Sequence, residues 1–344
     1  MQLLEQLIGT QAGLLIAFMA TATLVVLTGI KLSIFGDALG DRTGLGNGLI
    51  GLVFLAGVTS LPELVVSLTS VLNAVEPNQG ADLAVGNMLG SNVFNLLILA
   101  FIPLLFPKKF KPQDMENSHT DSTFYGLLML GIFSIAFLVN PVSIIPAVNS
   151  SWLTFILPIA YGVVLVREHR QHQNLNDPHL PEETRLTQLS TIHFYSILLG
   201  LCGLIIAGGI VLSILGSRMS LAPEQGGFGL EASLIGTIFL AISTSLPELV
   251  ISFASVRMGF LDMAVGNVLG SNMFNLLIVF VADVAMRGSS LMSHASQKHW
   301  TSVSLILLLT LMARALLSSK SRKTALPTAL GMLICYIAAM IFMV

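Results

Sequence analysis

Ten apolar segments, each long enough to cross a lipid bilayer, follow one another along the chain. About 20 apolar residues span the hydrocarbon core as a helix. Hydrophobic residues make up 54% of the 344 residues and charged residues only 10%, well below the roughly 25% of soluble domains. The sequence therefore predicts an all-α polytopic membrane protein. The ten predicted transmembrane helices are residues 12–30, 47–75, 82–105, 124–140, 150–166, 193–216, 230–256, 262–286, 300–317 and 324–343.

Lysine and arginine are distributed unevenly over the loops between these helices. Twelve fall on the side away from the termini and three on the side of the termini. Because Lys and Arg concentrate in cytoplasmic loops, a multi-pass protein of the cell membrane (plasma or inner membrane) with both termini outside is expected. The longest break, residues 167–192, is then a short cytoplasmic linker. Four histidines in or beside it match no metal-site spacing, so a solvated loop is expected there.

Two blocks of sequence occur twice in the chain. "TSLPELVVSLTS" at residues 59–70 and "TSLPELVISFAS" at 244–255 share nine of twelve residues. "DLAVGNMLGSNVFNLLI" at 82–98 and "DMAVGNVLGSNMFNLLI" at 262–278 share fourteen of seventeen. Chance similarity between apolar segments would match Leu and Val, but not Pro, Glu, Ser and Asn in register. The chain therefore contains an internal repeat.

The two copies are expected to cross the membrane in opposite directions, because five predicted spans separate each block from its counterpart. The predicted architecture is two inverted five-helix repeats, at residues 1–166 and 193–344, joined by the 167–192 linker. The motif blocks lie at 56–99 in the first repeat and 241–279 in the second. Transporters with inverted repeats bind their substrate near the membrane midplane, on interrupted helices.

Each copy places a glutamate directly after a proline in the middle of an apolar span. A charge at that depth costs about 2.5–3.5 kcal/mol on insertion scales, and Arg314 is the one Lys or Arg within the predicted spans. Pro62 and Pro247 each remove a helical hydrogen bond and free a carbonyl, in backbone that is tolerated only around a cavity. A bound cation is the expected partner of Glu63 and Glu248. The alternative is that both glutamates are protonated or helix-paired and serve packing alone.

Small polar side chains accompany both glutamates at helical spacing. Residues three or four apart share a helix face, and carboxylates, hydroxyls, amide oxygens and freed carbonyls together form an all-oxygen set suited to Ca²⁺ or Na⁺. Interhelical hydrogen bonding is the alternative role. Glycine seams at Gly86 with Gly90, and at Gly266 with Gly270, predict close helix approach. The polar residues are Thr59, Ser60, Glu63, Ser67, Asn87, Ser91 and Asn95, then Thr244, Ser245, Glu248, Ser252, Asn267, Ser271 and Asn275.

With its "TSLPEL" and "GNxxGSNxxN" segments the sequence resembles the calcium/cation antiporter superfamily, and within it the prokaryotic sodium/calcium exchanger homologues. The resemblance implies ten helices, an inverted repeat and central sites that hold several Na⁺ or one Ca²⁺. Asn275 stands where some members carry Asp, which leaves two carboxylates at the centre. The ligands that the resemblance implies are the carbonyls of Ala56 and Ala241, and Thr59, Ser60, Glu63, Ser91, Asn95, Thr244, Ser245, Glu248, Ser271 and Asn275.

The expected function is secondary active antiport of Ca²⁺ against Na⁺ by alternating access, with no enzymatic activity and no cofactor. A Ca²⁺/H⁺ antiporter that uses the same glutamates is the nearest alternative, because carboxylates also exchange protons. A channel is a third reading, although selectivity filters usually come from rings of subunits. The expected partners are the two ions and the lipid bilayer. A net charge of −2 gives no sign of a nucleic-acid partner. One chain should suffice for transport, and the sequence leaves the oligomeric state open.

Overall fold

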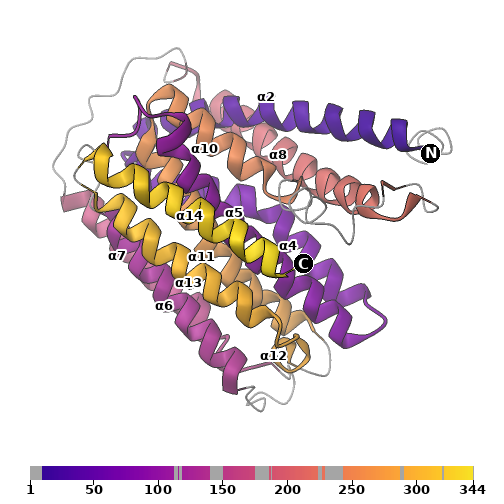
Figure 1. The fold of residues 1–344 in the computed structure, drawn as a ribbon. Helices are drawn as coiled ribbons and strands as arrows, with labels where there is room; N and C mark the ends of the chain where they lie inside the picture. Colours follow the sequence, from indigo (N-terminus) through magenta and orange to yellow (C-terminus); the bar gives the residue numbers. More distant parts are fainter. Residues whose placement is uncertain are drawn as a thin grey trace.

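Long helices that lie side by side make up the computed structural model of the chain (Figure 1). The structure describes residues 10–111, 115, 118–139, 150–174, 186, 188–223, 227–228, 243–286, 290–319 and 321–343. Within these residues, eight helices are long and apolar enough to cross a membrane. The expectation of an all-helical polytopic membrane protein is confirmed.

The helices follow the predicted apolar segments closely. In chain order they are α2 (Gln11–Thr43), α3 (Asn47–Leu49), the π-helix η1 (Ile50–Leu55), α4 (Ala56–Asn73), α5 (Pro77–Leu105), α6 (Ser118–Val139), α7 (Ile156–Asn174), α8 (Thr191–Ser220), α10 (Leu246–Met258), α11 (Leu261–Ala285), α12 (Leu291–His294), α13 (His299–Leu317) and α14 (Arg322–Met343).

Two predicted spans are not among the eight. The fifth corresponds to α7, whose second half carries Arg167, Glu168 and Arg170 and is therefore too polar. The seventh corresponds to α10, which has 13 residues. The preceding part of that predicted span, up to residue 242, lies outside the described residues.

The first helix is longer than the sequence indicated. The Thr10 hydroxyl caps its start by accepting a hydrogen bond from the Gly13 amide at 3.1 Å, and Gly44 ends it with φ of 69°. Its 33 residues extend about 50 Å at 1.5 Å per residue. Lys31, predicted to lie in the following loop, is an exposed residue within this helix. The helix continues because Leu32 and its successors on that face stay buried.

The central layer consists of α5 and α11, which pack against each other and against α4, η1 and α10. Figure 1 shows α2 and α8 running alongside each other at one edge, and these two helices contact α10 and α4 respectively. At the opposite edge lie α6, α7, α13 and α14, which contact the central pair. The repeated motifs therefore occupy the middle of the molecule.

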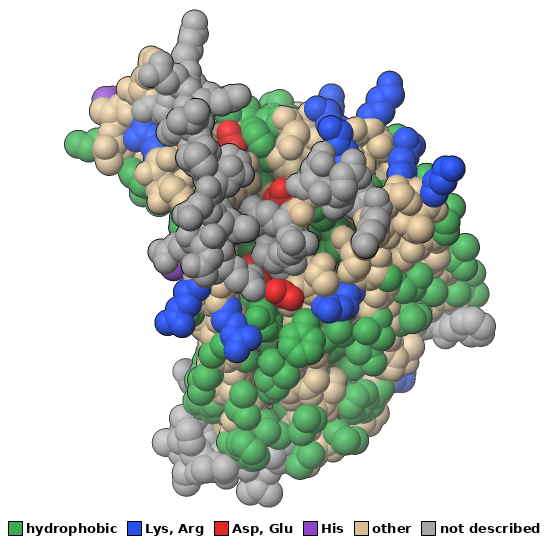
Figure 2. All heavy atoms as spheres, turned by 90° about the vertical axis from the view of Figure 1, so that its left-hand side faces the viewer, with side chains coloured by type: hydrophobic (Ala, Val, Ile, Leu, Met, Phe, Trp, Pro, Cys, Tyr) green, Lys and Arg blue, Asp and Glu red, His purple; other side chains and the backbone are tan. Residues whose placement is uncertain are grey.

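Apolar side chains cover much of the outer surface. Ile16, Leu138 and Leu199 are 65%, 71% and 70% exposed, as expected where lipid takes the place of water. Figure 2 looks onto the left-hand side of Figure 1, where Lys and Arg side chains gather above a broad hydrophobic area. The start of α2 and the end of α14 lie away from that side (Figure 1).

The second glycine seam brings α11 directly against the backbone of η1 and α3. A Cβ atom at Gly270 would lie 2.1 Å from the Leu52 carbonyl oxygen, and one at Gly266 would lie 2.3 Å from that of Gly48. Only glycine permits this approach, so the predicted seam is confirmed in the second copy. In the first copy, a Cβ at Gly90 would meet no atom of the described residues within 4 Å.

Candidate ion-binding centre

The two motif glutamates lie in the middle of the helical layer. Glu63, on α4, is 1% exposed and Glu248, on α10, is 0% exposed. Helices α4 and α10 contact each other, so the two glutamates lie on neighbouring helices. Two like charges in a water-excluded interior are strongly unfavourable unless cations or protons neutralise them. Glu63 and Glu248 belong to different repeats, and the fold brings both of them into the middle of the molecule.

The backbone next to each glutamate departs from a regular helix, but differently in the two copies. In the first, Pro62 lies inside the continuous helix α4, and the irregular turn is the π-helix η1 immediately before Ala56. In the second, the break falls at Ser245, with φ −101° and ψ 21°, and Pro247 occupies the first turn of α10. Both irregular turns lie within a few residues of the Thr-Ser pair, and π-type turns recur at functional sites.

Hydroxyl groups from the two repeats meet beside Glu63. The Thr59 hydroxyl lies 3.2 Å from the Ser271 hydroxyl and donates to the Ala56 carbonyl at 3.3 Å. The Ser245 hydroxyl donates to Ser91 Oγ at 3.3 Å, and Ser91 donates to Glu63 Oε1 at 3.4 Å. These contacts join residues of both predicted ligand groups into one cluster.

The first asparagine of each stripe ties its own pair of helices together. Asn87 Nδ2 donates to Ser67 Oγ at 3.0 Å and to the Glu63 carbonyl at 3.3 Å. In the second copy, Asn267 Nδ2 donates to Ser252 Oγ at 2.9 Å and to the Glu248 carbonyl at 3.5 Å. The same pair of bonds therefore forms in both repeats. For these four residues the interhelical role is the one that the structure shows.

Several buried oxygen atoms of the cluster accept no hydrogen bond from any described residue. Buried polar atoms in native proteins nearly always have a partner, so a group of exceptions in one place is typical of a binding site. Six of them are oxygens of predicted ligand residues, and hard cations prefer such donors. These six are Ser60 Oγ, Glu63 Oε2, Asn95 Oδ1, both carboxylate oxygens of Glu248, and Asn275 Oδ1, and Asn272 Oδ1 and Asn95 Nδ2 beside them are also unpartnered among the described residues.

The other predicted ligands fall into three cases. Thr59, Ser91, Ser245 and Ser271 are buried and take part in the hydroxyl contacts above. Thr244 is half-buried. Ala241 lies outside the described residues. The structure thus brings together predicted residues from both blocks, namely Ala56, Thr59, Glu63, Ser91, Ser245, Glu248 and Ser271.

Asn92 and Asn272 contact the cluster although they were not among the predicted ligands. Asn275 Nδ2 donates to Asn92 Oδ1 at 3.0 Å, and Asn272 Nδ2 donates to the Asn92 carbonyl at 3.3 Å. Both belong to the repeated Gly-Ser-Asn sequence. Their position directly after the ligand serines was a usable signal, because a polar residue repeated at membrane depth indicates a role.

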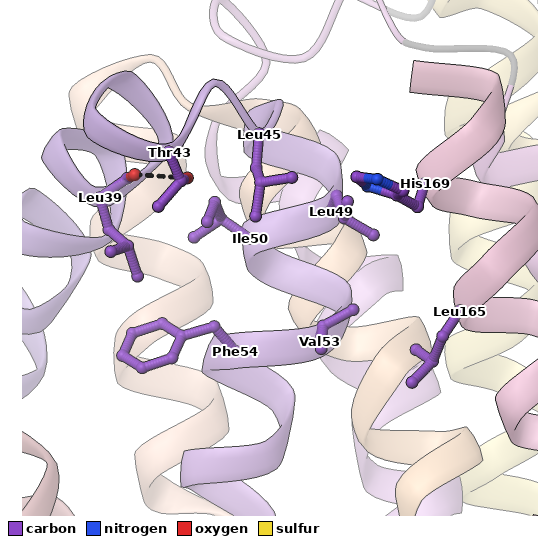
Figure 3. A pocket seen from close by; sticks show the side chains of 9 residues that line it. All are labelled: Leu39, Thr43, Leu45, Leu49, Ile50, Val53, Phe54, Leu165 and His169. Atoms are coloured by element: carbon purple, nitrogen blue, oxygen red, sulfur yellow. Dashed lines mark hydrogen bonds between the residues drawn. The ribbon is translucent and has the colours of Figure 1, made fainter. Parts of the chain in front are cut away.

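A separate cavity of about 310 Å³ lies between α2, η1 and α7 (Figure 3). Its polar side chains are Thr43, whose hydroxyl donates to the Leu39 carbonyl at 2.7 Å, and His169. The residues that line it include no carboxylate, so it is not the cation centre. They are Leu39, Thr43, Leu45, Leu49, Ile50, Val53, Phe54, Leu165 and His169.

Comparison with known proteins identifies the family of the chain. A family model described as "Sodium/calcium exchanger protein" matches residues 12–167 and 200–344. The inner membrane protein YrbG of Escherichia coli strain K12 is 31% identical over 268 residues, which cover 76% of this chain and 77% of YrbG. CaxA of Alkalimonas amylolytica, named as a candidate antiporter, is 29% identical over 273 residues, covering 76% and 79%.

A solved structure of the sodium-calcium exchanger NCX_Mj, soaked with Na⁺ and Ca²⁺, matches this chain with a TM-score of 0.66. The match covers 95% of this chain and 97% of NCX_Mj at 18% identity, so it shows a shared fold. The family match and the relatives place the chain among membrane antiporters, which are transporters and not enzymes. The chain belongs to the sodium/calcium exchanger protein family.

Proposed function

We propose that this protein exchanges Ca²⁺ for Na⁺ across the cell membrane as a secondary active antiporter that works by alternating access. The observation that supports this most directly is the pair of buried carboxylates, Glu63 and Glu248, surrounded by unpartnered oxygen atoms within the described residues. Family membership supports the same ions. The ions are substrates, and the proposed cycle needs no cofactor.

Charge and ligand number fit the proposed substrates. Two carboxylates balance one Ca²⁺, and several Na⁺ can replace it around the same oxygens. Ca²⁺ accepts six to eight oxygen ligands in flexible geometry, which hydroxyls, amides and freed carbonyls can complete. The proposed ligands are the carbonyls of Ala56 and Ala241, and Thr59, Ser60, Glu63, Ser91, Asn95, Thr244, Ser245, Glu248, Ser271 and Asn275.

The proposed architecture is ten transmembrane helices in two inverted five-helix repeats, residues 1–166 and 193–344, with 167–192 as a cytoplasmic linker. The bonds of Asn87 and of Asn267 to equivalent partners support a repeat. The basic face in Figure 2, opposite the start of α2 and the end of α14, supports termini that lie outside. One chain contains both halves of the centre, so the transport unit is proposed to be a monomer in the lipid bilayer.

Transport driven by separate gradients tests the exchanged ion. Inside-out vesicles that contain the protein should take up Ca²⁺ when a Na⁺ gradient is imposed at constant pH, and not when a proton gradient is imposed without Na⁺. Vesicles that contain the Glu63→Gln variant serve as the control, because they should show only the Ca²⁺ uptake that does not depend on the proposed site. Uptake driven by protons alone would replace the proposed function with Ca²⁺/H⁺ exchange, and conductance far above carrier turnover would replace it with a channel.

A further inference from the structure

Asn92 on α5 and Asn272 on α11 link the two central helices beside the ion centre. Asn92 is 1% exposed and Asn272 is 9% exposed. Each lies three residues before a proposed ligand, Asn95 and Asn275 respectively, so it sits next to that ligand on its helix. Asn92 nevertheless bonds to the ligand of the other repeat, because its Oδ1 accepts from Asn275 Nδ2 at 3.0 Å.

This bond fixes which end of the Asn275 amide faces the centre. An amide side chain offers one acceptor oxygen and one donor NH₂ group, and a cation can use only the oxygen. Since the NH₂ group of Asn275 is held by Asn92, the Oδ1 atom is left without a partner among the described residues. Asn92 therefore orients the Asn275 oxygen as a ligand without being a ligand itself.

The repeat predicts a second bond of the same kind, and this conformation lacks it. The two blocks align with an offset of 180, so Asn92 corresponds to Asn272 and Asn95 to Asn275. The equivalent bond would run from Asn95 Nδ2 to Asn272 Oδ1. Both of these atoms, and Asn95 Oδ1, are buried without a hydrogen-bond partner among the described residues. Of the two bonds that the repeat relates, the one between Asn275 and Asn92 is therefore present, and the one between Asn95 and Asn272 is not.

We propose that Asn92 and Asn272 are positioning residues that act in turn, one for each orientation of the transporter. In the conformation described, Asn92 orients Asn275. In the oppositely facing conformation, Asn272 orients Asn95 and the Asn92–Asn275 bond opens. The proposal rests on the proposed antiport function and its inverted repeats: when oppositely oriented halves exchange conformations, the site changes the side it faces.

Space for this exchange is present beside Asn272. A cavity of about 20 Å³ borders Asn92, Asn272, Thr123 and Thr310, between α5, α6, α11 and α13. That volume is about the minimum that one water molecule occupies. A space about the size of one water molecule therefore borders the Asn272 side chain. The unpartnered groups also favour movement, since a buried polar atom without a hydrogen-bond partner is destabilising.

The test measures Ca²⁺ affinity separately on each face of the membrane. The full chain is reconstituted in a uniform orientation, and the KM for Ca²⁺ is determined from the outside and from the inside. Asn92→Ala should raise the KM about three- to tenfold on one face, as loss of one hydrogen bond predicts. Asn272→Ala, its matched counterpart, should raise it by a similar factor on the opposite face. A purely structural role would change both faces alike.

Two further variants separate orientation of the ligand from damage to the fold. Asn92→Asp keeps the accepting oxygen and should retain the wild-type KM or lower it, whereas Asn92→Leu should behave like Asn92→Ala. In an Asn275→Ala background, Asn92→Ala should have no further effect on the KM, because the side chain that it orients is gone.

Equal effects on both faces, or no effect of either alanine variant, would overturn the proposal. Loss of affinity in Asn92→Asp would overturn it as well, because the orienting acceptor remains in that variant. If Na⁺-driven exchange is intact and sensitive to Glu63→Gln while the asparagine variants are silent, the positioning role fails and the antiport function stands. If the wild-type protein shows no Na⁺-driven exchange, the function itself fails, and the positioning role with it.

Discussion

At the scale of the residue, the two glutamates differ although their sequence surroundings are nearly identical. Glu63 Oε1 accepts a hydrogen bond from Ser91, whereas neither carboxylate oxygen of Glu248 accepts one from a described residue. The backbone differs as well, because the Thr-Ser-Leu-Pro-Glu motif lies in a continuous helix shortly after a π-helix in one copy and contains the break at Ser245 in the other. An inverted repeat in one conformation need not be symmetric at its site.

Neutralising either glutamate should abolish exchange without unfolding the protein. Glu63→Gln and Glu248→Gln each remove one of two charges that balance Ca²⁺, so transport should fall to the background of empty vesicles. Folding should be retained, because a neutral amide at membrane depth is cheaper than a charge. Ca²⁺ uptake and the yield of monodisperse protein measure the two effects.

Glu76→Gln is the control for that pair, because Glu76 is exposed in the turn before α5. It should transport like the wild type. Normal uptake by both buried variants would reduce Glu63 and Glu248 to packing residues, which is the alternative that the sequence left open.

At the scale of the element, the approach of α11 to η1 determines the width of the ion centre. Gly266 and Gly270 allow the two backbones to touch, and this contact holds Thr59 on α4 within 3.2 Å of Ser271 on α11. Because Thr59 and Ser271 belong to different repeats, any separation of the elements enlarges the space between proposed ligands. Packing and binding are therefore coupled at this seam.

A methyl group at this seam should weaken both stability and binding. Gly270→Ala would place a Cβ atom 2.1 Å from the Leu52 carbonyl oxygen, and overpacking of a core typically costs about 1–3 kcal/mol. We expect a lower thermal midpoint in detergent and a higher KM for Ca²⁺. Gly203→Ala on α8, where a Cβ would meet no described atom within 4 Å, should change neither. A midpoint for Gly270→Ala that equals the wild type would show that the contact is not close in the membrane.

Much of this arrangement follows from the sequence because a chain in lipid must satisfy its backbone hydrogen bonds internally, which favours helices. Apolar length fixes the helices, and the repeated Pro-Glu and Asn-Ser patterns identify the polar cluster. The sequence could not show that Pro62 stays inside a continuous helix while the irregular turn moves upstream to η1. Nor could it show that Asn92 reaches across to Asn275. The position of the irregular turn and the Asn92–Asn275 bond both depend on how α11 packs against its neighbouring helices, which the sequence does not show.

At the scale of the whole molecule, the buried carboxylates explain why exchange is expected in place of uniport. The central layer is enclosed by α2 and α8 on one edge and by α6, α7, α13 and α14 on the other (Figure 1). An empty centre would move two uncompensated negative charges through a dry interior, at a desolvation cost of several kcal/mol per ion. One Ca²⁺ or several Na⁺ removes this cost, so the loaded forms can reorient and the empty form cannot.

The coupling between Na⁺ and Ca²⁺ follows from the different ability of the loaded and empty forms to reorient, and it can be measured in one experiment. Na⁺ should lower the apparent Ca²⁺ affinity competitively and steeply, with more than one Na⁺ involved, because both ions occupy the same oxygens. Efflux of Ca²⁺ from loaded vesicles should nearly stop when the facing solution contains neither Na⁺ nor Ca²⁺, since the carrier is then unable to return. The measurement requires clamped pH and no membrane potential. Efflux at the full rate into that solution would mean that the empty carrier crosses freely, and the charge argument for coupling would then be wrong.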